Sequence, residues 1–327
     1  MLSSIYTQGF KGFKDTRIEP IRKVNLILGG QNVGKTSLLE AVYLGASDLG
    51  SFQFLATIFR PFEGRDRERY MTSVWGKKPC VVELCDGGST WVRVGINNDS
   101  QGSADFYDLD GIQVGDFLNR RWVAQIPMSR APAAALNSVS FLNPLAVSIH
   151  LPQQLAAVQL FDRVVMSRKK RKLLDMLKRI EPRLEDMHSL SPDGEQRIYV
   201  ELTGEGDALP LPLLGHGFSR LVHLYCSLLV SEAKLALIDE VENGIHYSSL
   251  PTLFQGIQDI AANSGVQTMM TTHSWECIRA AYNTFAQAGK LEDFQLIRLE
   301  READNIRAVV INDEQLVAAM EAGYEIR

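Results

Sequence analysis

The chain has 327 residues and a mass of 36.5 kDa, which suits one elaborated α/β domain or two coupled lobes. Hydrophobic residues make up 45% and charged residues 22%, so the composition excludes a disordered, collagen-like or coiled-coil protein. The 34 Lys and Arg against 39 Asp and Glu give a net charge of -5. There is therefore no overall basic excess that would indicate a nucleic-acid-binding protein, although a local basic patch is still compatible with one.

Four cysteines are present, and none of them forms a C-x-x-C pair. A disulfide framework or a structural zinc site is therefore not expected, and we infer a reducing, cytoplasmic location. The most apolar stretch, residues 221–238, is interrupted by polar and charged residues, so we expect no membrane-spanning helix and no membrane partner.

The N-terminal part alternates apolar and polar residues and leads to a predicted buried strand at residues 24–28. A glycine-rich turn and a predicted helix at residues 37–44 follow. Residues from about 50 to 130 look different, because Gly and Asp turns separate short strand-like segments. We expect a β-rich insertion there, with strands at residues 81–84, 90–96, 106–109 and 112–114.

Residues 152–187 carry apolar side chains at helical spacing, so the whole stretch is predicted to be helical. A strand at residues 198–202 and a loop rich in Gly and Pro lead to residue 212. Strand and helix then alternate, which is typical of βαβ units with a largely parallel sheet. The predicted helices cover residues 218–231, 249–263 and 275–288, and the predicted strands cover residues 235–238, 268–271, 295–300 and 307–311.

Residues 29–36, GGQNVGKT, fit the pattern G-x-x-x-x-G-K-[ST] in full and lie between a predicted strand and a predicted helix. The glycines let the backbone wrap tightly and point its N–H groups at a phosphate, and the helix start adds positive charge. Lys35 is expected to reach the β- and γ-phosphates, and Thr36 to bind Mg²⁺. The predicted ATP-binding residues of this loop are Gly29, Gln31, Asn32, Val33, Gly34, Lys35, Thr36 and Ser37.

A second motif, residues 235–240 (LALIDE), is an apolar strand that ends in two acids. Asp239 is expected to hold Mg²⁺, and Glu240 to polarise the attacking water. His273 follows the next predicted strand, at the edge where open α/β sheets bind ligands. We expect His273 to contact the γ-phosphate and to act in catalysis together with Glu240 and Lys35.

Residues 214–220 (LGHGFSR) open the helix that precedes the acidic strand. One reading is an ordinary helix entry with a glycine cap. The other is a second anion site made by Gly215, Gly217 and Ser219. Because the chain already has one phosphate loop, such a site would act most simply on nucleotide held by another copy. This predicts an ATP-sandwiched homodimer or a higher assembly.

The order of these motifs resembles the ABC-type ATPases, and within them the group of SMC, RecF and OLD-like proteins. The closest resemblance is to stand-alone, OLD-like AAA-type ATPases of prokaryotic defence loci. It covers nearly the whole chain, is weakest from about 50 to 130, and is carried by residues 9–13, 24–29, 214–220, 239–246, 271–274 and 314–327.

The resemblance implies an α/β fold: an ABC-type P-loop ATPase head with a mixed or parallel sheet, a β-rich insertion and a helical lobe. The expected division is an N-terminal ATPase half at 1–150, the helical lobe at 151–212 and a C-terminal ATPase half at 213–327. In family terms, the Walker A pair, the Walker B pair and the switch histidine are Lys35 with Thr36, Asp239 with Glu240, and His273.

Residues 244–246 would lie in the D-loop and residues 214–218 would form the signature loop. Transporters have a serine where this chain has Gly215, and His216 replaces the first glycine of that loop. Gln125 and Gln153 are both candidates for the Q-loop glutamine.

The implied function is that of an Mg·ATP-hydrolysing enzyme that dimerises on ATP and controls a separately encoded effector, such as a TOPRIM-like nuclease, in anti-phage defence. The alternative is a RecF- or SMC-like DNA-repair ATPase, and a third reading is a scaffold that binds ATP but scarcely hydrolyses it. No sustained heptads occur between Lys35 and Asp239, which argues against a long SMC-type coiled coil. The chain also stops at Arg327 without room for a nuclease domain, so we expect the effector to be a separate chain.

The densest basic stretch, residues 168–172 (RKKRK), lies in the predicted helical lobe. A solvated helical face explains it without any ligand. The alternative is that these side chains contact DNA phosphates or an acidic partner.

Overall fold

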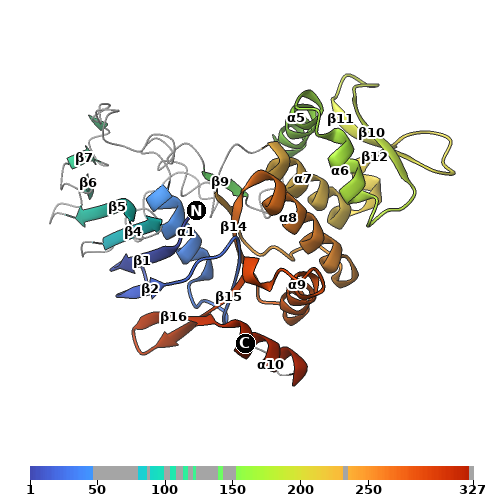
Figure 1. Cartoon of the computed structure of the whole chain (residues 1–327). Coiled ribbons are helices and arrows are strands. Elements are labelled where there is room, and N and C mark those ends of the chain that lie inside the picture. The colour runs from blue at the N-terminus through green and yellow to red at the C-terminus, as the bar shows by residue number, and fades with distance from the viewer. Residues whose placement is uncertain are drawn as a thin grey trace.

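The computed structural model describes residues 1–46, 80–86, 89–98, 104–107, 113–116, 121–122, 139–142, 152–230 and 235–323. Within this part of the chain, the strands form a six-stranded, a seven-stranded and a three-stranded sheet. The two larger sheets lie on one side of the molecule, and the smallest sheet lies with helices on the other side (Figure 1).

The six-stranded sheet has the order β16-β15-β3-β14-β13-β9. Its strands are β3 (Val24–Leu28), β9 (Val139–Leu142), β13 (Leu235–Ile238), β14 (Gln267–Thr271), β15 (Phe294–Glu302) and β16 (Asn305–Ile311). All neighbours pair in parallel except β15 with β16, which form an antiparallel hairpin. The carboxyl ends of β3, β14 and β13 therefore lie next to one another at one edge of the sheet.

Both faces of this sheet are covered, which explains the uninterrupted apolar runs of its central strands. In β13, Leu235 and Leu237 pack toward α1 (Lys35–Ala46), while Ala236 and Ile238 pack toward the helices on the opposite face. The helices on that face are α7 (His216–Val230), α8 (Leu250–Ser264) and α9 (Trp275–Gln287).

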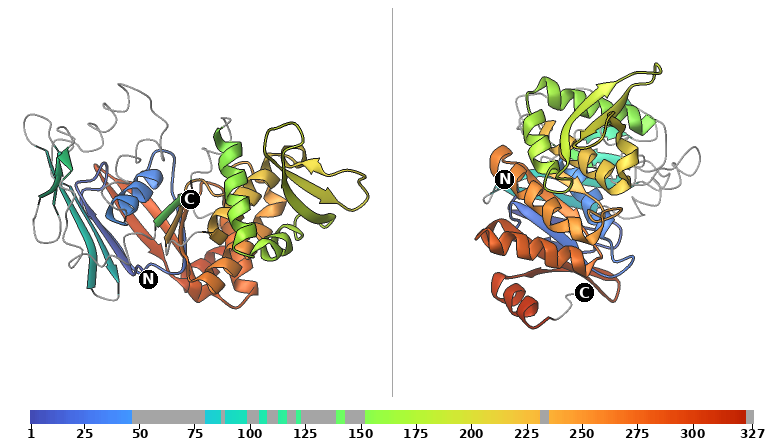
Figure 2. Two further views of the ribbon diagram at one scale, coloured as in Figure 1. Left: turned by 90° about the horizontal axis from the view of Figure 1, so that it is seen from above. Right: turned by 90° about the vertical axis from the view of Figure 1, so that its right-hand side faces the viewer.

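The seven-stranded sheet is antiparallel and has the order β2-β1-β4-β5-β6-β7-β8. Its strands are β1 (Ser4–Gln8), β2 (Thr16–Ile18), β4 (Cys80–Asp86), β5 (Ser89–Asn98), β6 (Ala104–Tyr107), β7 (Gln113–Asp116) and β8 (Arg121–Trp122). Strands predicted in the region from about 50 to 130 are thus confirmed, and β4 continues the N-terminal sheet by pairing with β1. The view from above places α1 between this sheet and the six-stranded one (Figure 2).

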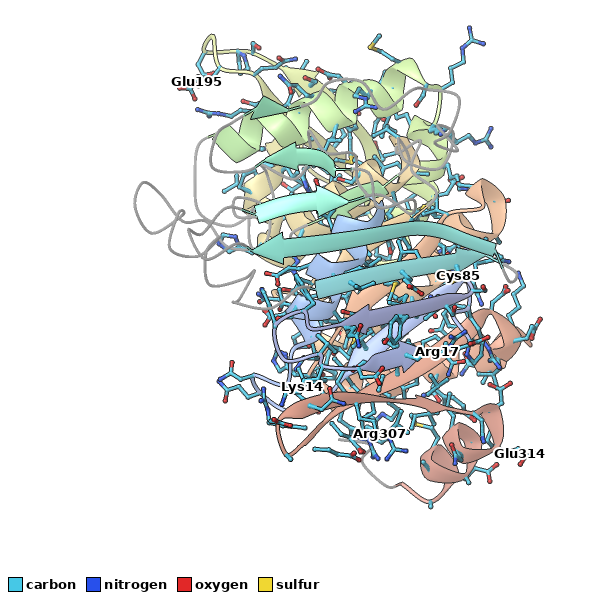
Figure 3. All side chains as sticks on the ribbon, turned by 90° about the vertical axis from the view of Figure 1, so that its left-hand side faces the viewer. Lys14, Arg17, Cys85, Glu195, Arg307 and Glu314 are labelled. Carbon is cyan, nitrogen blue, oxygen red and sulfur yellow. The ribbon has the colours of Figure 1, made fainter. Side chains whose placement is uncertain are left out.

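The two larger sheets also meet at the edges formed by β2 and β16, where Lys14 and Arg307 are labelled in Figure 3. The hydroxyl of Thr16 donates a hydrogen bond to the carbonyl oxygen of Ile306. The side-chain oxygen of Asn305 accepts one from the N–H of Lys14, at 2.9 Å. These contacts bring the β15–β16 hairpin against the N-terminal turn that lies beside the glycine-rich loop.

The predicted helix over residues 152–187 is confirmed in α5 (Pro152–Met166) and α6 (Lys170–Leu177) but is wrong at its end. Residues from Leu184 to Leu190 form strand β10, which pairs antiparallel with β11 (Arg197–Leu202). Pro182 disfavours a continued helix, and Gly194, with φ of +84°, lies in the turn that joins the two strands. Pairing with β11 therefore overrides the helical spacing of the apolar residues.

The expected loop up to residue 212 also contains structure: strand β12 (Leu209–Pro210), which pairs with β11, and the 3₁₀ helix η3 (Leu211–Leu214). After residue 212 each predicted helix and strand is present, with ends shifted by a few residues. The remaining short helices are η4 (Tyr247–Ser249), η5 (Leu291–Asp293) and α10 (Asp313–Glu321). None of the helices in the described ranges is both long enough and apolar enough to span a membrane.

Two side chains of the basic stretch are held by contacts within the fold. The ammonium of Lys169 donates to the carbonyl oxygen of Leu229, at 2.6 Å, near the carboxyl end of α7. Lys170 forms an ion pair with Asp186 at 2.7 Å. Contacts within the fold therefore account for Lys169 and Lys170 without a ligand. Arg171, in contrast, is exposed, as a solvated helical face predicts.

Candidate nucleotide site

The structure brings three of the predicted motifs together at one edge of the six-stranded sheet. The glycine-rich loop follows β3, Asp239 follows β13, and His273 comes shortly after β14, which lies between the other two strands. They surround a cavity of about 750 Å³. Its lining residues are Gln31, Asn32, Val33, Gly34, Lys35, Thr36, Ser37, Asp239, Glu240 and His273.

Two glycines of the loop are required by its shape. Gly29 has φ of +147°, and a Cβ there would lie 2.6 Å from the carbonyl oxygen of Leu299. Gly34 has φ of +102°, and a Cβ there would lie 2.7 Å from Cδ1 of Ile306. Both the backbone conformation and the neighbouring β15–β16 hairpin therefore exclude larger residues, which fixes the loop before any ligand binds.

Lys35 begins α1 and turns its side chain back over the loop. Its ammonium donates to the carbonyl oxygens of Gly29 at 2.7 Å and of Gly30 at 3.0 Å. Burial lowers the pKa of Lys35, and nearby carboxylates partly oppose this. Those carboxylates belong to Asp239, Glu240 and Glu242. A cation in this position faces the cavity, where a phosphate chain could replace the two carbonyl contacts.

Asp239 is buried and held on both sides by hydroxyl groups. Thr36 donates to its Oδ2 at 2.9 Å, and Thr271, at the end of β14, donates to its Oδ1 at 2.5 Å. The Thr271 oxygen also accepts from the N–H of Glu240 at 2.8 Å. No role for Thr271 was predicted from the sequence, although a hydroxyl at the end of the strand that precedes His273 is the one signal that indicates this bridge.

The oxygen atoms of Thr36 and Asp239 fit the ligand preference of Mg²⁺, which binds through one or two protein oxygens together with phosphate oxygens and water. Among the residues that the structure describes, no three His, Cys, Asp or Glu side chains are grouped as a metal site made by protein alone. Thr36 and Asp239 are therefore the residues that would hold a magnesium ion shared with a bound nucleotide.

Glu240 has φ of +49°, in the left-handed region that residues with a Cβ rarely adopt. Its Oε2 accepts a hydrogen bond from the Asn243 side chain at 3.3 Å. The buried carboxylate of Glu242 accepts from the N–H of His273 at 3.0 Å, and Nδ1 of that histidine lies 3.3 Å from the same oxygen. The His273 side chain is 64% exposed. Glu242 therefore holds the backbone of His273 in place while the ring stays accessible at the cavity.

Arg220 and Glu242 are further residues around this site for which the sequence predicted no role. The Arg220 guanidinium donates to the carbonyl oxygen of Glu240 at 2.9 Å. Arg220 comes from the first part of α7, so it links the predicted second glycine loop to the acidic turn.

The second loop itself does not line this cavity. α7 begins at His216, so Gly215 precedes the helix and Gly217 lies inside its first turn. A Cβ on Gly217 would lie 2.8 Å from the carbonyl oxygen of Gly244. The Ser219 hydroxyl donates to the Gly215 carbonyl at 3.1 Å. Within one chain, Gly215, Gly217 and Ser219 are therefore not brought to the loop of Lys35.

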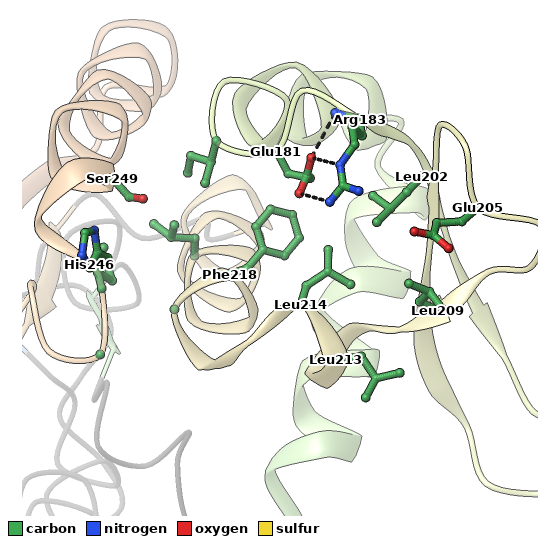
Figure 4. Close-up of a pocket in the computed structure, with 15 residues that line it drawn as sticks. Glu181, Arg183, Leu202, Glu205, Leu209, Leu213, Leu214, Phe218, His246 and Ser249 are labelled. Atoms are coloured by element: carbon green, nitrogen blue, oxygen red, sulfur yellow. Dashed lines mark hydrogen bonds and ion pairs between the residues drawn. The ribbon is translucent and has the colours of Figure 1, made fainter.

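Gly217 instead lines a second cavity, of about 540 Å³, between α7, the residues after Gly244 and the three-stranded sheet (Figure 4). Its walls combine apolar side chains with charged ones, and an Arg183–Glu181 ion pair lies at one side. Of the two Q-loop candidates, Gln125 lies outside the described residues, and Gln153 is described only as part of α5.

The chain is similar in sequence to known ATPases. The family model of the AAA ATPase domain matches residues 137–278. An "ATP/GTP phosphatase" of Helicobacter pylori (strain ATCC 700392 / 26695) is 21% identical over 371 aligned positions, which cover 97% of this chain and 100% of that protein. The chain is an ATPase. With the parallel and antiparallel strands of its six-stranded sheet, it has the predicted α/β fold of an ABC-type P-loop ATPase.

Solved SMC heads share the fold of this ATPase. The SMC head domain from Thermotoga maritima superposes with a TM-score of 0.57 at 15% identity, covering 95% of this chain and 99% of that one. An SMC head bound to the C-winged helix domain of ScpA gives 0.64 at 12% identity, covering 96% and 99%. At such low identity the likeness concerns the fold alone.

Proposed function

We propose that this ATPase binds Mg·ATP between two copies of the chain and uses the closing and opening of that dimer to control a separately encoded effector. The proposal of a dimer is supported mainly by the position of the loop at residues 215–217. It lies outside the nucleotide cavity of its own chain, and the space around the Cβ position of Gly215 is open. A helix start that is accessible in this way suits phosphate held by a second copy.

In this proposal Thr36 and Asp239 hold Mg²⁺, which neutralises phosphate charge when it is bound. Lys35 exchanges its two carbonyl contacts for the β- and γ-phosphates. Glu240 orients the water that attacks the γ-phosphate and accepts its proton. His273, held by Glu242, contacts the γ-phosphate. ATP binding and hydrolysis thus give two states with different surfaces.

Two observations support a protein partner as the output of this ATPase. The motif order resembles OLD-like ATPases of defence loci, which suggests an effector such as a TOPRIM-like nuclease in anti-phage defence. One SMC head of the same fold is known in a complex with a domain of another protein, ScpA. We therefore favour an effector that binds the closed dimer.

The second candidate function is a RecF- or SMC-like ATPase that grips DNA. The exposed side chains of Arg168 and Arg171 favour it, because they extend from the lobe into solvent and could contact phosphates. Lys169 and Lys170 are less suitable tests, since their removal would also break contacts within the lobe.

Both candidate functions are tested by measuring the mass of Glu240→Gln in solution by light scattering, with and without Mg·ATP. The measurement is then repeated with the product of the adjacent gene and with duplex DNA. A doubling of mass with Mg·ATP supports the dimer, and Lys35→Ala is the matched control that should stay monomeric. A further ATP-dependent increase with the neighbouring protein, but not with DNA, supports effector control. An increase with DNA alone, lost in Arg168→Gln/Arg171→Gln, supports the DNA-binding alternative. A Glu240→Gln protein that stays monomeric with Mg·ATP contradicts the proposed dimer.

A further inference from the structure

Arg220 holds the backbone of the turn that carries Glu240. It lies on α7 three residues after Gly217, so the two residues are neighbours on one face of the helix. Its Nη2 donates to the carbonyl oxygen of Glu240 at 2.9 Å. Its Nη1 lies 3.4 Å from the position that a Cβ on Gly244 would occupy. The guanidinium thus lies against both ends of the turn from residue 240 to residue 244.

The turn needs such a support because Glu240 adopts a left-handed conformation. A residue with a Cβ in this region persists only when its surroundings fix it. Here the N–H of Glu240 is held by Thr271 at 2.8 Å, and its carbonyl oxygen accepts from Arg220 and from the N–H of Asn243, at 3.0 Å. The backbone is therefore fixed on both sides of the Glu240 Cα.

The charge of Arg220 strengthens this contact. Burial lowers the pKa of Arg220 to about 10, and the carboxylates of Glu242 and Glu240 oppose the shift. The guanidinium is thus protonated at neutral pH. A buried hydrogen bond from a charged donor is stronger than one between neutral groups. Asn243 adds a contact to the Glu240 carboxylate, so backbone and side chain are restrained together.

We propose that Arg220 is a positioning residue that aims the Glu240 carboxylate at the attacking water and joins it rigidly to the start of α7. The inference rests on the proposed role of Glu240. Gly217 packs on Gly244, and Arg220 follows on the same face of the helix. Any displacement of the helix start, including one caused by a second copy, therefore reaches the backbone of Glu240.

Steady-state hydrolysis and ATP binding of Arg220→Gln and Arg220→Lys test this inference. We expect kcat of Arg220→Gln to fall about 10- to 100-fold, because a misplacement of about 1 Å is enough for such a loss. The dissociation constant for ATP should change less than about threefold, since Arg220 does not line the nucleotide cavity. Arg220→Lys keeps one charged donor and should recover part of kcat.

The matched control is Arg163→Gln, because Arg163 also donates to a main-chain carbonyl of α7, that of Val230, at the other end of the helix. Its kcat should equal that of the wild type. Circular dichroism and the melting temperature would reveal whether Arg220→Gln folds. If it does not fold, Arg220→Lys is tested instead, and its kcat should fall while its dissociation constant for ATP stays close to that of the wild type.

A double variant separates this inference from the proposed role of Glu240. With Glu240 already replaced by Gln, loss of Arg220 should cost no further activity in single-turnover measurements. A similar loss in both backgrounds, or wild-type kcat in Arg220→Gln, would overturn the inference. Wild-type turnover of Glu240→Gln alone would instead remove the proposed role of Glu240.

Discussion

The ATPase contains two glycine-containing loops that each open a helix, and their surroundings differ. The loop of residues 29–34 before α1 is enclosed: Gly29 and Gly34 are packed against the β15–β16 hairpin, and Lys35 is bonded to the loop backbone. Before α7, the loop around Gly215 has open space, and Gly217 contacts the chain at Gly244. The first loop is completed by its own chain, whereas the second presents its helix start outward.

This difference suggests separate roles for the two loops. An enclosed loop with fixed N–H groups is preorganised, so it can bind phosphate within one chain at little conformational cost. An open loop gains its missing contacts only from another molecule. The comparison therefore predicts that changes at the first loop weaken ATP binding by a single chain, while changes at the second affect association.

The largest effect is expected for Lys35→Ala. The ammonium is a half-buried cation at the cavity, and its loss would remove the proposed charge-assisted contacts with two phosphates. We expect ATP affinity to fall at least about 100-fold, or about 3 kcal/mol, measured by titration calorimetry. Lys178→Ala, at the end of α6 and away from the cavity, is the control. Equal affinities of the two variants would contradict a phosphate-binding role for the first loop.

Gly34→Ala should have the next largest effect, and Gly30→Ala is its matched control. Alanine at position 34 must adopt φ near +102° and would press on Ile306, whereas a Cβ on Gly30 meets no atom within 4 Å. We expect Gly34→Ala to lower the free energy of unfolding by about 2 kcal/mol. Gly30→Ala should change it by less than about 0.5 kcal/mol. Urea denaturation measures both, and a neutral Gly34→Ala would show that the loop is less tightly enclosed than its contacts indicate.

The enclosed loop is also the part that the sequence predicts best. The glycine pattern between an apolar strand and a helix has few structural solutions, so β3, the loop and α1 follow from residues that are close in the chain. Likewise, four apolar residues before Asp239 predict β13, because a strand with both faces covered needs no polar side chains. Local pattern and fold agree in these segments.

What the sequence could not predict depends on contacts between distant segments. The apolar spacing predicts a helix from Leu184 onward, but these residues form β10 by pairing with β11. The pairing of β4 with β1 makes the expected insertion part of the N-terminal sheet. The bridge from Thr271 to Asp239 requires knowing that β14 lies beside β13. The hydrogen bond from Arg220 to the carbonyl oxygen of Glu240 cannot be predicted from residue types, because every residue has a main-chain carbonyl.

The second loop can also be compared with the first through the helix that follows it, because α7 carries the largely buried side chain of His223. Burial and the nearby positive charge of Arg220 lower the pKa of His223 to about 4, from an ordinary value of 6.5. Between these values the unfolded chain binds a proton that the folded protein excludes, so stability falls as pH falls. From pH 7 to pH 5 we expect a loss of about 2 kcal/mol in the free energy of unfolding.

Urea denaturation of His223→Leu at the two pH values checks this expectation. The variant should lose that part of the pH dependence, while His216→Gln, at the exposed start of the same helix, should keep it. The same pH slope in His223→Leu and in the wild type would mean that His223 is not the group that titrates.

Gly217→Ala should give the smallest effect and addresses the open loop directly. A Cβ there would lie 2.8 Å from the Gly244 carbonyl oxygen, so the helix start must shift by a few tenths of an ångström. Because Gly217 is outside the nucleotide cavity, ATP affinity of the single chain should stay unchanged. When Gly217→Ala is added to Glu240→Gln, the dissociation constant of the ATP-dependent dimer should rise about fivefold, or about 1 kcal/mol, in sedimentation experiments. Gly206→Ala, where a Cβ meets no atom within 4 Å, should leave it unaltered. If Gly217→Ala instead weakened ATP binding and left association intact, the two loops would share one role, and the contrast between them would be a matter of packing alone.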